Sequence, residues 1–351
     1  MRKYILICIA ASLYYSGLVA LARVYTRLRG QRLIILNYHQ ASAGNLERQL
    51  LYLRRFYHIL PVEKALEELY SSPPLSLSSS KRATLLALTF DDGYYDNYSH
   101  AFPLAKRLQV PLTFYLIPGY IGETKRFWWQ EGKQLVTCSQ VATLSYEGQH
   151  FDLRKAKGKK ALAHFINARL RFSSSIEERE AFLCQMRLKL AISGEVTDRE
   201  QAHLTLSWEQ IQEMEQSGWI SFGAHTMHHP ILACLADQKE IQYEVQECRY
   251  TLEKQLGHEV SSFAYPVGQL QHFDSRTLHA VQKAGYRWAL TTNYGINTPQ
   301  SYPYQLKRIE VDVCQHWLIV ACEAAGLWGF FSRLRWNAFV RQYWTNAPSA
   351  R

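Results

Sequence analysis

Two adjacent carboxylates and a spaced pair of histidines are the residues of this chain best suited to metal chemistry. Asp91 and Asp92 end the apolar run 85–93, and a buried ionised carboxylate is costly unless it has a partner such as a metal ion. His225 and His229 are four residues apart, a spacing that points both imidazoles the same way. One carboxylate and two imidazoles leave positions open for water and substrate, which is typical of a hydrolytic metal centre. Zinc is the first expectation for such N/N/O ligands.

Each of these groups ends or directly follows an apolar run that is predicted to be a strand. The predicted strands are 33–39, 85–92, 110–117, 219–224, 260–264, 288–292 and 306–311. Helical patterns lie between them, at 45–56, 62–70, 101–108, 208–217, 238–256 and 275–284. Strand, helix and strand with short connections indicate a parallel sheet. The carboxyl ends of its strands meet at one edge, and His39 follows the first strand at that edge.

The 351-residue chain is predicted to contain four parts. They are a membrane anchor or signal segment (1–30), an α/β barrel in two pieces (31–119 and 206–315), a mainly helical insertion that covers one side of the site (120–205), and an amphipathic aromatic C-terminal helix (316–351). That last helix fits a membrane surface. Docking on the barrel through its aromatic residues is an equal alternative.

The N-terminal segment is predicted to associate with a membrane. Residues 4–22 carry no charge and are numerous enough to span a bilayer. A cleaved signal peptide is the alternative, but the long apolar stretch and the arginines directly after it favour an uncleaved anchor. We expect the catalytic domain to be exported. The cytoplasmic face stays open as an alternative, because basic residues flank both ends of the segment.

The net charge of +10 favours anionic surroundings such as phospholipid headgroups, nucleic acid or an acidic glycan. Part of the charge lies in the run 154–160, which has no interleaved aromatic residue. A solvated loop or helix start is therefore expected there, and no nucleic-acid partner. The seven cysteines form no C-x-x-C pair, so neither a zinc ribbon nor a disulfide framework is indicated.

The motifs Thr89-Phe90-Asp91-Asp92-Gly93 and His225-Thr226-x-x-His229-Pro230 together resemble the polysaccharide deacetylases of carbohydrate esterase family 4, which have the NodB-homology fold. The resemblance covers roughly residues 33–311, apart from much of 120–205. It implies a distorted (β/α)7-type barrel. It also implies a hydrolase of linear amide C–N bonds that removes N-acetyl groups from amino sugars in a polysaccharide or a lipid-linked glycan.

The same resemblance implies a role for each motif residue. Asp91 is expected to be the general base, and Asp92 the metal ligand together with His225 and His229. This division is chemically sensible, because a carboxylate bound to a cation cannot easily accept a proton whereas its neighbour can. His228 fits no ligand position.

The oxyanion of the reaction is expected to face the metal and the backbone N–H of Val267, by resemblance to the family's turn, which here reads Tyr265-Pro266-Val267-Gly268. The general acid is expected to be His39. Its motif, Leu36-Asn37-Tyr38-His39, matches the family's L-x-x-H but stands at the N-terminal end of the domain. This arrangement resembles the permuted order of the poly-N-acetylglucosamine deacetylase subgroup.

Two departures from the family pattern bear on the site. Ala264 stands where many members have an arginine that orients the base, and the acidic partner expected near Trp288 is missing. Arg308, beside the last predicted strand, is a candidate to supply the guanidinium.

Two functions other than deacetylation are compatible with these residues. A catalytically weak carbohydrate-binding barrel is one alternative, and hydrolysis of another C–N bond, such as a formamide or ring amide, is a second. A glycosidase is disfavoured, because the adjacent Asp91 and Asp92 cannot readily flank a sugar at the ~5–9 Å separation of those mechanisms.

Overall fold

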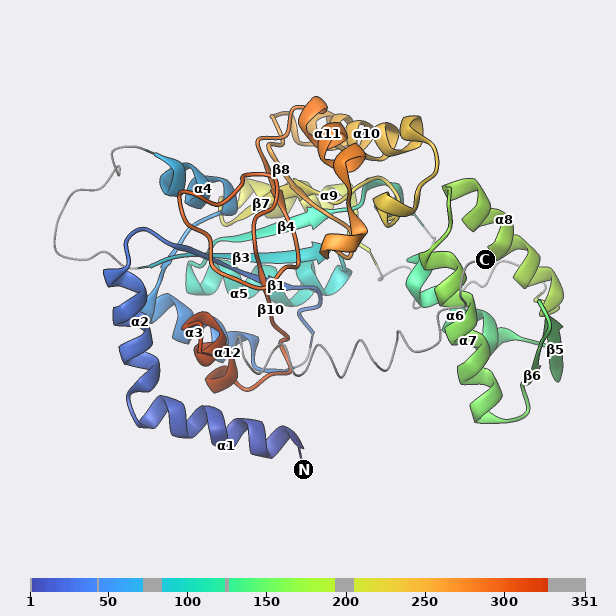
Figure 1. The fold of residues 1–351 in the computed structure, drawn as a ribbon, viewed down its shortest axis with the longest axis horizontal. Helices are drawn as coiled ribbons and strands as arrows, with labels where there is room; N and C mark the ends of the chain where they lie inside the picture. The colour runs from blue at the N-terminus through green and yellow to red at the C-terminus, as the bar shows by residue number, and fades with distance from the viewer. Residues whose placement is uncertain (1, 43, 72–83, 124–125, 193–204, 328–351) are drawn as a thin grey trace.

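A single curled parallel sheet organises the molecule (Figure 1). The computed structural model describes residues 2–42, 44–71, 84–123, 126–192 and 205–327. The sheet order is β10-β1-β3-β4-β7-β8-β9, with β2 paired to β3 off this path. The strands are β1 (Leu33–Tyr38), β2 (His58–Ile59), β3 (Leu85–Asp92), β4 (Leu112–Leu116), β7 (Ile220–Ala224), β8 (Ser262–Ala264), β9 (Trp288–Leu290) and β10 (Ile309–Glu310). This half-barrel confirms the predicted fold class.

Both faces of the central strands are buried, as expected for a parallel sheet covered on each side. In β1, Ile34 and Leu36 point into the larger apolar core, whereas Leu33 and Ile35 point into a second core that also holds Ala87 of β3. The continuous apolar runs of the sequence therefore reflect burial on two sides. A strand in such a position can be recognised from its composition alone.

Helices cover the two faces of the sheet. They are α3 (Leu46–Phe56), α4 (Val62–Tyr70), α5 (Phe102–Leu108), α9 (Trp208–Gln216), α10 (Gln238–Leu256), α11 (Ser275–Lys283) and α12 (Trp317–Ala324). A π-helical turn, Asn97–Ala101, precedes α5. The ranges predicted for α4 and α10 agree with the observed bounds. A capping box between Ser207 and Gln210 sets the start of α9.

The segment 120–205, called the insertion below, leaves the sheet after β4 and returns before β7. It contains α6 (Trp128–Cys138), the hairpin β5 (Thr143–Tyr146) and β6 (Gln149–Asp152), α7 (Ala156–Arg171) and α8 (Ile176–Lys189). These elements share their own apolar cluster and lie at the right-hand end of Figure 1. The insertion is mainly helical, as predicted. The sequence did not predict α6 or the β5–β6 hairpin.

The N-terminal uncharged segment forms two helices, α1 (Arg2–Tyr15) and α2 (Leu18–Leu28). The axes differ by 64°, and the break falls at Gly17, whose φ of 82° suits glycine. One face of α1 packs on the body, where the rings of Tyr14 and Trp317 lie 5.1 Å apart. In the described ranges no single helix is long and apolar enough to cross a membrane. Taken together, α1 and α2 are long and apolar enough to cross one, by length and composition alone.

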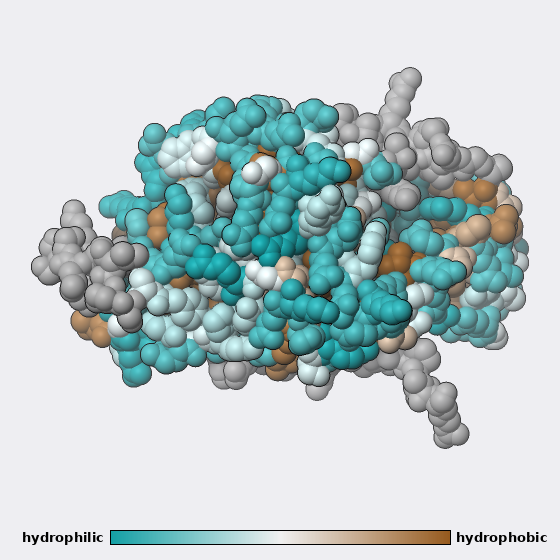
Figure 2. Space-filling model, turned by 90° about the horizontal axis from the view of Figure 1, so that it is seen from above, coloured by the Kyte–Doolittle hydropathy of each residue, from teal (hydrophilic) through white to brown (hydrophobic). Residues whose placement is uncertain are grey.

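The described part of the predicted C-terminal helix, α12, is buried against the body. The remainder of 316–351 lies outside the described residues from position 328 on, and so does its predicted membrane contact. The face of the molecule drawn in Figure 2 is predominantly hydrophilic.

Candidate metal centre and catalytic residues

The register of three neighbouring strands brings the metal-binding motifs together. Asp92 at the end of β3 pairs with Leu116 of β4, which pairs with Ala224 at the end of β7. His225 follows at once, and its N–H donates to the Leu116 carbonyl at 2.9 Å. Strands two spacings apart are about 10 Å from each other. The side chains of Asp92 and His225 cross this gap from opposite sides.

The three predicted ligands meet at one point. The Nε2 atoms of His225 and His229 each lie 3.6 Å from Asp92 Oδ1, and the potential ligand atoms of all three residues lie within 4.8 Å of one another. Two ligands ~2.1 Å from a tetrahedral ion are about 3.4 Å apart, so the spacing fits one divalent cation. Asp92 Oδ1 is also buried without a hydrogen-bond partner, a cost that a bound cation would remove.

Both imidazoles are in the neutral form that a metal requires. Burial lowers the pKa of His225 to about 4 and lowers the pKa of His229 well below its usual value. His225 Nδ1 is 2.7 Å from the Ala264 carbonyl. Because that carbonyl can only accept, the proton sits on Nδ1 and the Nε2 lone pair faces Asp92.

The Asp92 carboxyl holds its proton unusually strongly without a cation. Burial raises its pKa to about 7; the His39 charge opposes this rise and the Asp91 charge adds to it. Since a cation binds only the ionised form, binding must displace that proton.

The affinity for a divalent cation, measured with Zn²⁺ as the probe, is therefore expected to fall as the pH drops through about 7, approaching one proton released per ion on the acidic side. His225 does not contribute, because its pKa of about 4 leaves it neutral over this range. Dissociation constants measured by chelator competition between about pH 6 and 8 check this. Asp92→Asn should bind more weakly and without this pH dependence; a wild-type profile in that variant would contradict the assignment.

Asp91, the predicted base, is held by Arg308 and Asn37. Arg308 Nη1 and Nη2 donate to its two carboxylate oxygens at 2.7 and 2.8 Å, and Asn37 Nδ2 donates at 3.1 Å. Arg308 Nε donates in turn to the Thr291 carbonyl at 2.9 Å. Burial works to raise the pKa of Asp91, but the charge of Arg308 and its hydrogen bonds outweigh it and leave the pKa well below its usual range. Asp91 is thus ionised at neutral pH.

The predicted acid, His39, lies half-buried just past β1. It follows the strand that neighbours β3 in the sheet, so it stands at the same edge as Asp91 and Asp92. The Asn97 side chain donates to the His39 carbonyl at 3.0 Å and holds the backbone there.

The turn Tyr265-Pro266-Val267-Gly268 follows β8 at the same edge. The Val267 carbonyl accepts from Thr292 Oγ1 at 2.7 Å, and within the described residues the Val267 N–H donates no hydrogen bond. Tyr265 is buried in the core, and its hydroxyl donates to the Tyr304 carbonyl at 3.1 Å. Among the N–H groups of this turn, that of Val267 is therefore the one without a partner in the described part of the chain.

Backbone strain is concentrated at this edge of the sheet. Among the described residues, seven other than glycine have positive φ, and four of them are Asp92 (77°), Thr226 (66°), His229 (54°) and Val267 (59°). Such conformations cost free energy and persist only where the surroundings enforce them, commonly at functional sites.

Several neighbours of the site were not predicted. Asn37 interrupts an otherwise apolar strand, which was a usable signal. Glu244 is fully buried; its carboxylate accepts from the His228 N–H at 2.9 Å and bonds His228 Nδ1 at 2.6 Å. That engagement explains why His228 is not a ligand. Nothing in the local pattern around Glu244 separated it from other acids of α10.

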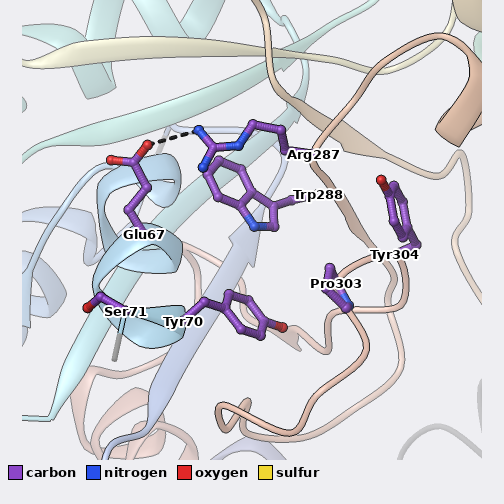
Figure 3. A pocket seen from close by; sticks show the side chains of 7 residues that line it. All are labelled: Glu67, Tyr70, Ser71, Arg287, Trp288, Pro303 and Tyr304. Carbon is purple, nitrogen blue, oxygen red and sulfur yellow. Dashed lines mark hydrogen bonds and ion pairs between the residues drawn. The ribbon is translucent and has the colours of Figure 1, made fainter. Parts of the chain in front are cut away.

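A surface pocket lies at the other end of the strands and contains none of the predicted site residues. Figure 3 shows the side chains around it, which come from the end of α4 and the residue after it, from the start of β9 and the residue before it, and from the loop before β10: Glu67, Tyr70, Ser71, Arg287, Trp288, Pro303 and Tyr304. Its lining shares no residue with the group formed by Asp92, His225 and His229.

The fold is an α/β half-barrel whose site lies at the carboxyl ends of the strands, and the family match defines the protein as a hydrolase. Residues 78–289 match the polysaccharide deacetylase family, and the chain belongs to that family. The match contains Asp91, Asp92, His225 and His229. His39 lies before the matched range and Arg308 lies after it. The roles of these two residues therefore depend on geometry and on the resemblance of the N-terminal motif.

The chain is also similar to individual proteins. The chain is 24% identical over 290 residues to YxkH of Bacillus subtilis (strain 168), which is named after the polysaccharide deacetylases; the aligned part covers 80% of this chain and 71% of YxkH. Among solved structures, IcaB from Ammonifex degensii superposes with a TM-score of 0.54 at 21% identity, covering 84% of this chain and 98% of IcaB. A de-N-acetylase from Aggregatibacter actinomycetemcomitans gives 0.53 at 13% identity, covering 84% and 100%. At these identities the superpositions establish the fold.

Proposed function

We propose that this polysaccharide deacetylase removes N-acetyl groups from amino sugars of a polysaccharide or lipid-linked glycan, and that it needs a divalent cation held by Asp92, His225 and His229. Zn²⁺ is the first choice for this ligand set. The observation that carries the proposal is Asp92 Oδ1, a buried oxygen without a hydrogen-bond partner that lies 3.6 Å from two imidazole nitrogens.

The roles of the protein groups follow from their surroundings. A water oxygen attacks the acetyl carbon while Asp91, ionised and oriented by Arg308 and Asn37, takes its proton. The C–N bond then breaks, His39 gives a proton to the leaving amine, and acetate is released. The Val267 N–H donates to the oxyanion formed in between. A bound cation would polarise the carbonyl and lower the pKa of nearby water.

Acetate release from a panel of N-acetylated glycans, with and without chelator, tests this function. We expect hydrolysis that chelation abolishes and Zn²⁺ restores, and none from His225→Ala, which lacks a ligand. Chelator-resistant release would overturn the metal requirement. Faster release from formylated or cyclic amides would move the function to another C–N bond, and sugar binding without any release would indicate a binding protein.

We further propose that α1 and α2 hold the enzyme on a membrane, with the catalytic domain exported. The two helices contain no acidic residue, and eight large apolar side chains on them are exposed: Tyr4, Ile5, Tyr15, Leu18, Leu21, Val24, Tyr25 and Leu28. Their other faces pack on the body, where Ala10 and Val19 are buried. An apolar face beside Arg29 suits an anionic lipid surface.

Replacing Leu21 and Leu28, which are 64% and 81% exposed, by aspartate is expected to weaken vesicle binding at least ~30-fold, because about 2 kcal/mol of apolar burial is lost. Co-sedimentation of the full chain with phosphatidylglycerol vesicles measures this. Leu188→Asp, at a 77% exposed leucine of α8, is the matched control and should bind normally. Equal binding by all three proteins would remove the membrane proposal.

A further inference from the structure

The two imidazoles of the proposed metal centre are held in different ways. Histidine ligands commonly donate their second ring nitrogen to a carbonyl or carboxylate, which fixes the ring. His225 does so through Nδ1 and the Ala264 carbonyl. His229 turns Nε2 to Asp92, but its Nδ1 is buried without a hydrogen-bond partner. Another contact must therefore orient the His229 ring.

Two tryptophans of the insertion provide that contact. The Trp129 ring lies 4.6 Å from the His229 imidazole, centroid to centroid, and the Trp128 ring lies 6.1 Å away. Trp128 Nε1 also donates to the His229 carbonyl at 2.9 Å. Both residues begin α6. The ring and the backbone of one ligand are thus held from outside the sheet.

Trp129 is itself fixed on three sides. Its ring stacks on Phe127 with a centroid distance of 4.5 Å and an interplanar angle of 7°. Its Nε1 donates to the Tyr94 hydroxyl at 2.9 Å, and its carbonyl accepts from Asn167 Nδ2 at 3.1 Å. A side chain fixed in this way can transmit the position of the insertion to its neighbour.

The insertion reaches the same loop at a second point. Arg179 of α8 is almost fully buried, and its Nη1 donates to the His228 carbonyl at 3.0 Å. His229 has a φ of 54°, a conformation that must be maintained by its surroundings. Contacts to two successive carbonyls of the loop supply this support.

We propose that Trp128 and Trp129 are positioning residues for the metal ligand His229, with ring packing in place of the hydrogen bond that its Nδ1 lacks. This role rests on the proposed metal centre. It makes the insertion part of the metal site.

The dissociation constant for Zn²⁺, measured by chelator competition on the full chain, tests the role directly. Trp129→Ala is expected to weaken binding about 10–100-fold, the usual effect of losing a group that orients a ligand. Trp129→Phe keeps a ring against His229 and should recover most of the affinity. Trp128→Phe loses one hydrogen bond to the loop and should weaken binding about fivefold.

Phe165→Ala is the matched control. Phe165 of α7 packs on Tyr146 and Phe151 inside the insertion's own apolar cluster. This variant should lower the thermal unfolding midpoint of the metal-free protein and leave the dissociation constant unchanged. A general loosening of the insertion would instead weaken Zn²⁺ binding in Phe165→Ala as much as in Trp129→Ala, and would overturn the proposal.

Other outcomes are equally decisive. Wild-type affinity in Trp129→Ala overturns the positioning role while leaving the metal centre intact. If that variant does not fold, wild-type affinity in Trp128→Phe rejects the role, because that variant has lost the hydrogen bond to the His229 carbonyl. A wild-type chain that binds no Zn²⁺ would remove the metal centre itself. Because metal binding is measured without substrate, failure of deacetylation alone does not affect this test.

Discussion

The variant Arg308→Met is expected to be about 3–5 kcal/mol less stable than the wild type near neutral pH, because it leaves the Asp91 carboxylate buried without its counter-charge. Both side chains are almost fully buried, and the guanidinium makes two hydrogen bonds to the carboxylate, at 2.7 and 2.8 Å. Urea unfolding measures the difference. Turnover should fall as well, since the unpaired carboxyl is driven toward its protonated form and then cannot act as a base.

The pH dependence of this effect has a definite sign. The folded-state pKa of Asp91 is depressed, so its stabilising contribution is present above the unfolded value of ~3.9 and is lost as the pH falls below it. The stability gap between wild type and variant should therefore narrow in acid.

Arg287→Met is the matched control for Arg308→Met. Arg287 pairs with Glu67 at 3.0 Å, but both side chains are about half exposed (Figure 3). An exposed pair contributes about 0–1 kcal/mol. Equal losses in the two variants would show that burial of the Arg308–Asp91 pair has no special importance.

His39→Ala is expected to lower turnover by ~10²–10⁴-fold, the usual contribution of a positioned proton donor. The bound metal should remain, because His39 is outside the group formed by Asp92, His225 and His229. Acetate release, together with metal content, measures both quantities. In a pH–rate profile the alkaline limb should disappear with the proton donor.

His258→Ala serves as the control for the loss of an imidazole. His258 is half exposed and pairs with Glu215 at 2.6 Å, away from the metal-binding group. Its turnover should stay within about twofold of the wild type, as expected for a surface substitution. Unchanged turnover in His39→Ala would assign the proton donor to another residue.

Much of the fold could be predicted from the sequence, because its signals are local. Apolar runs of strand length and helical periodicity between them indicated the parallel sheet, and α4 and α10 begin and end where the pattern placed them. Polar residues at strand ends, such as Asp92 and His225, indicated the edge of the sheet that holds the site. The hairpin β5–β6 lacked such a signal, since its strands are short and largely exposed.

The sequence by itself determined the sheet, the family and the identities of the proposed metal ligands, because these depend on residue types at short spacing. Only the tertiary structure decided which residues far away in the sequence hydrogen-bond to Asp91 and to the metal ligands. Arg308 lies 217 positions from Asp91, and Trp128 lies 101 positions from the carbonyl of His229 that it bonds. No periodicity connects residues so far apart; the curl of the sheet and the packing of the insertion bring them into contact.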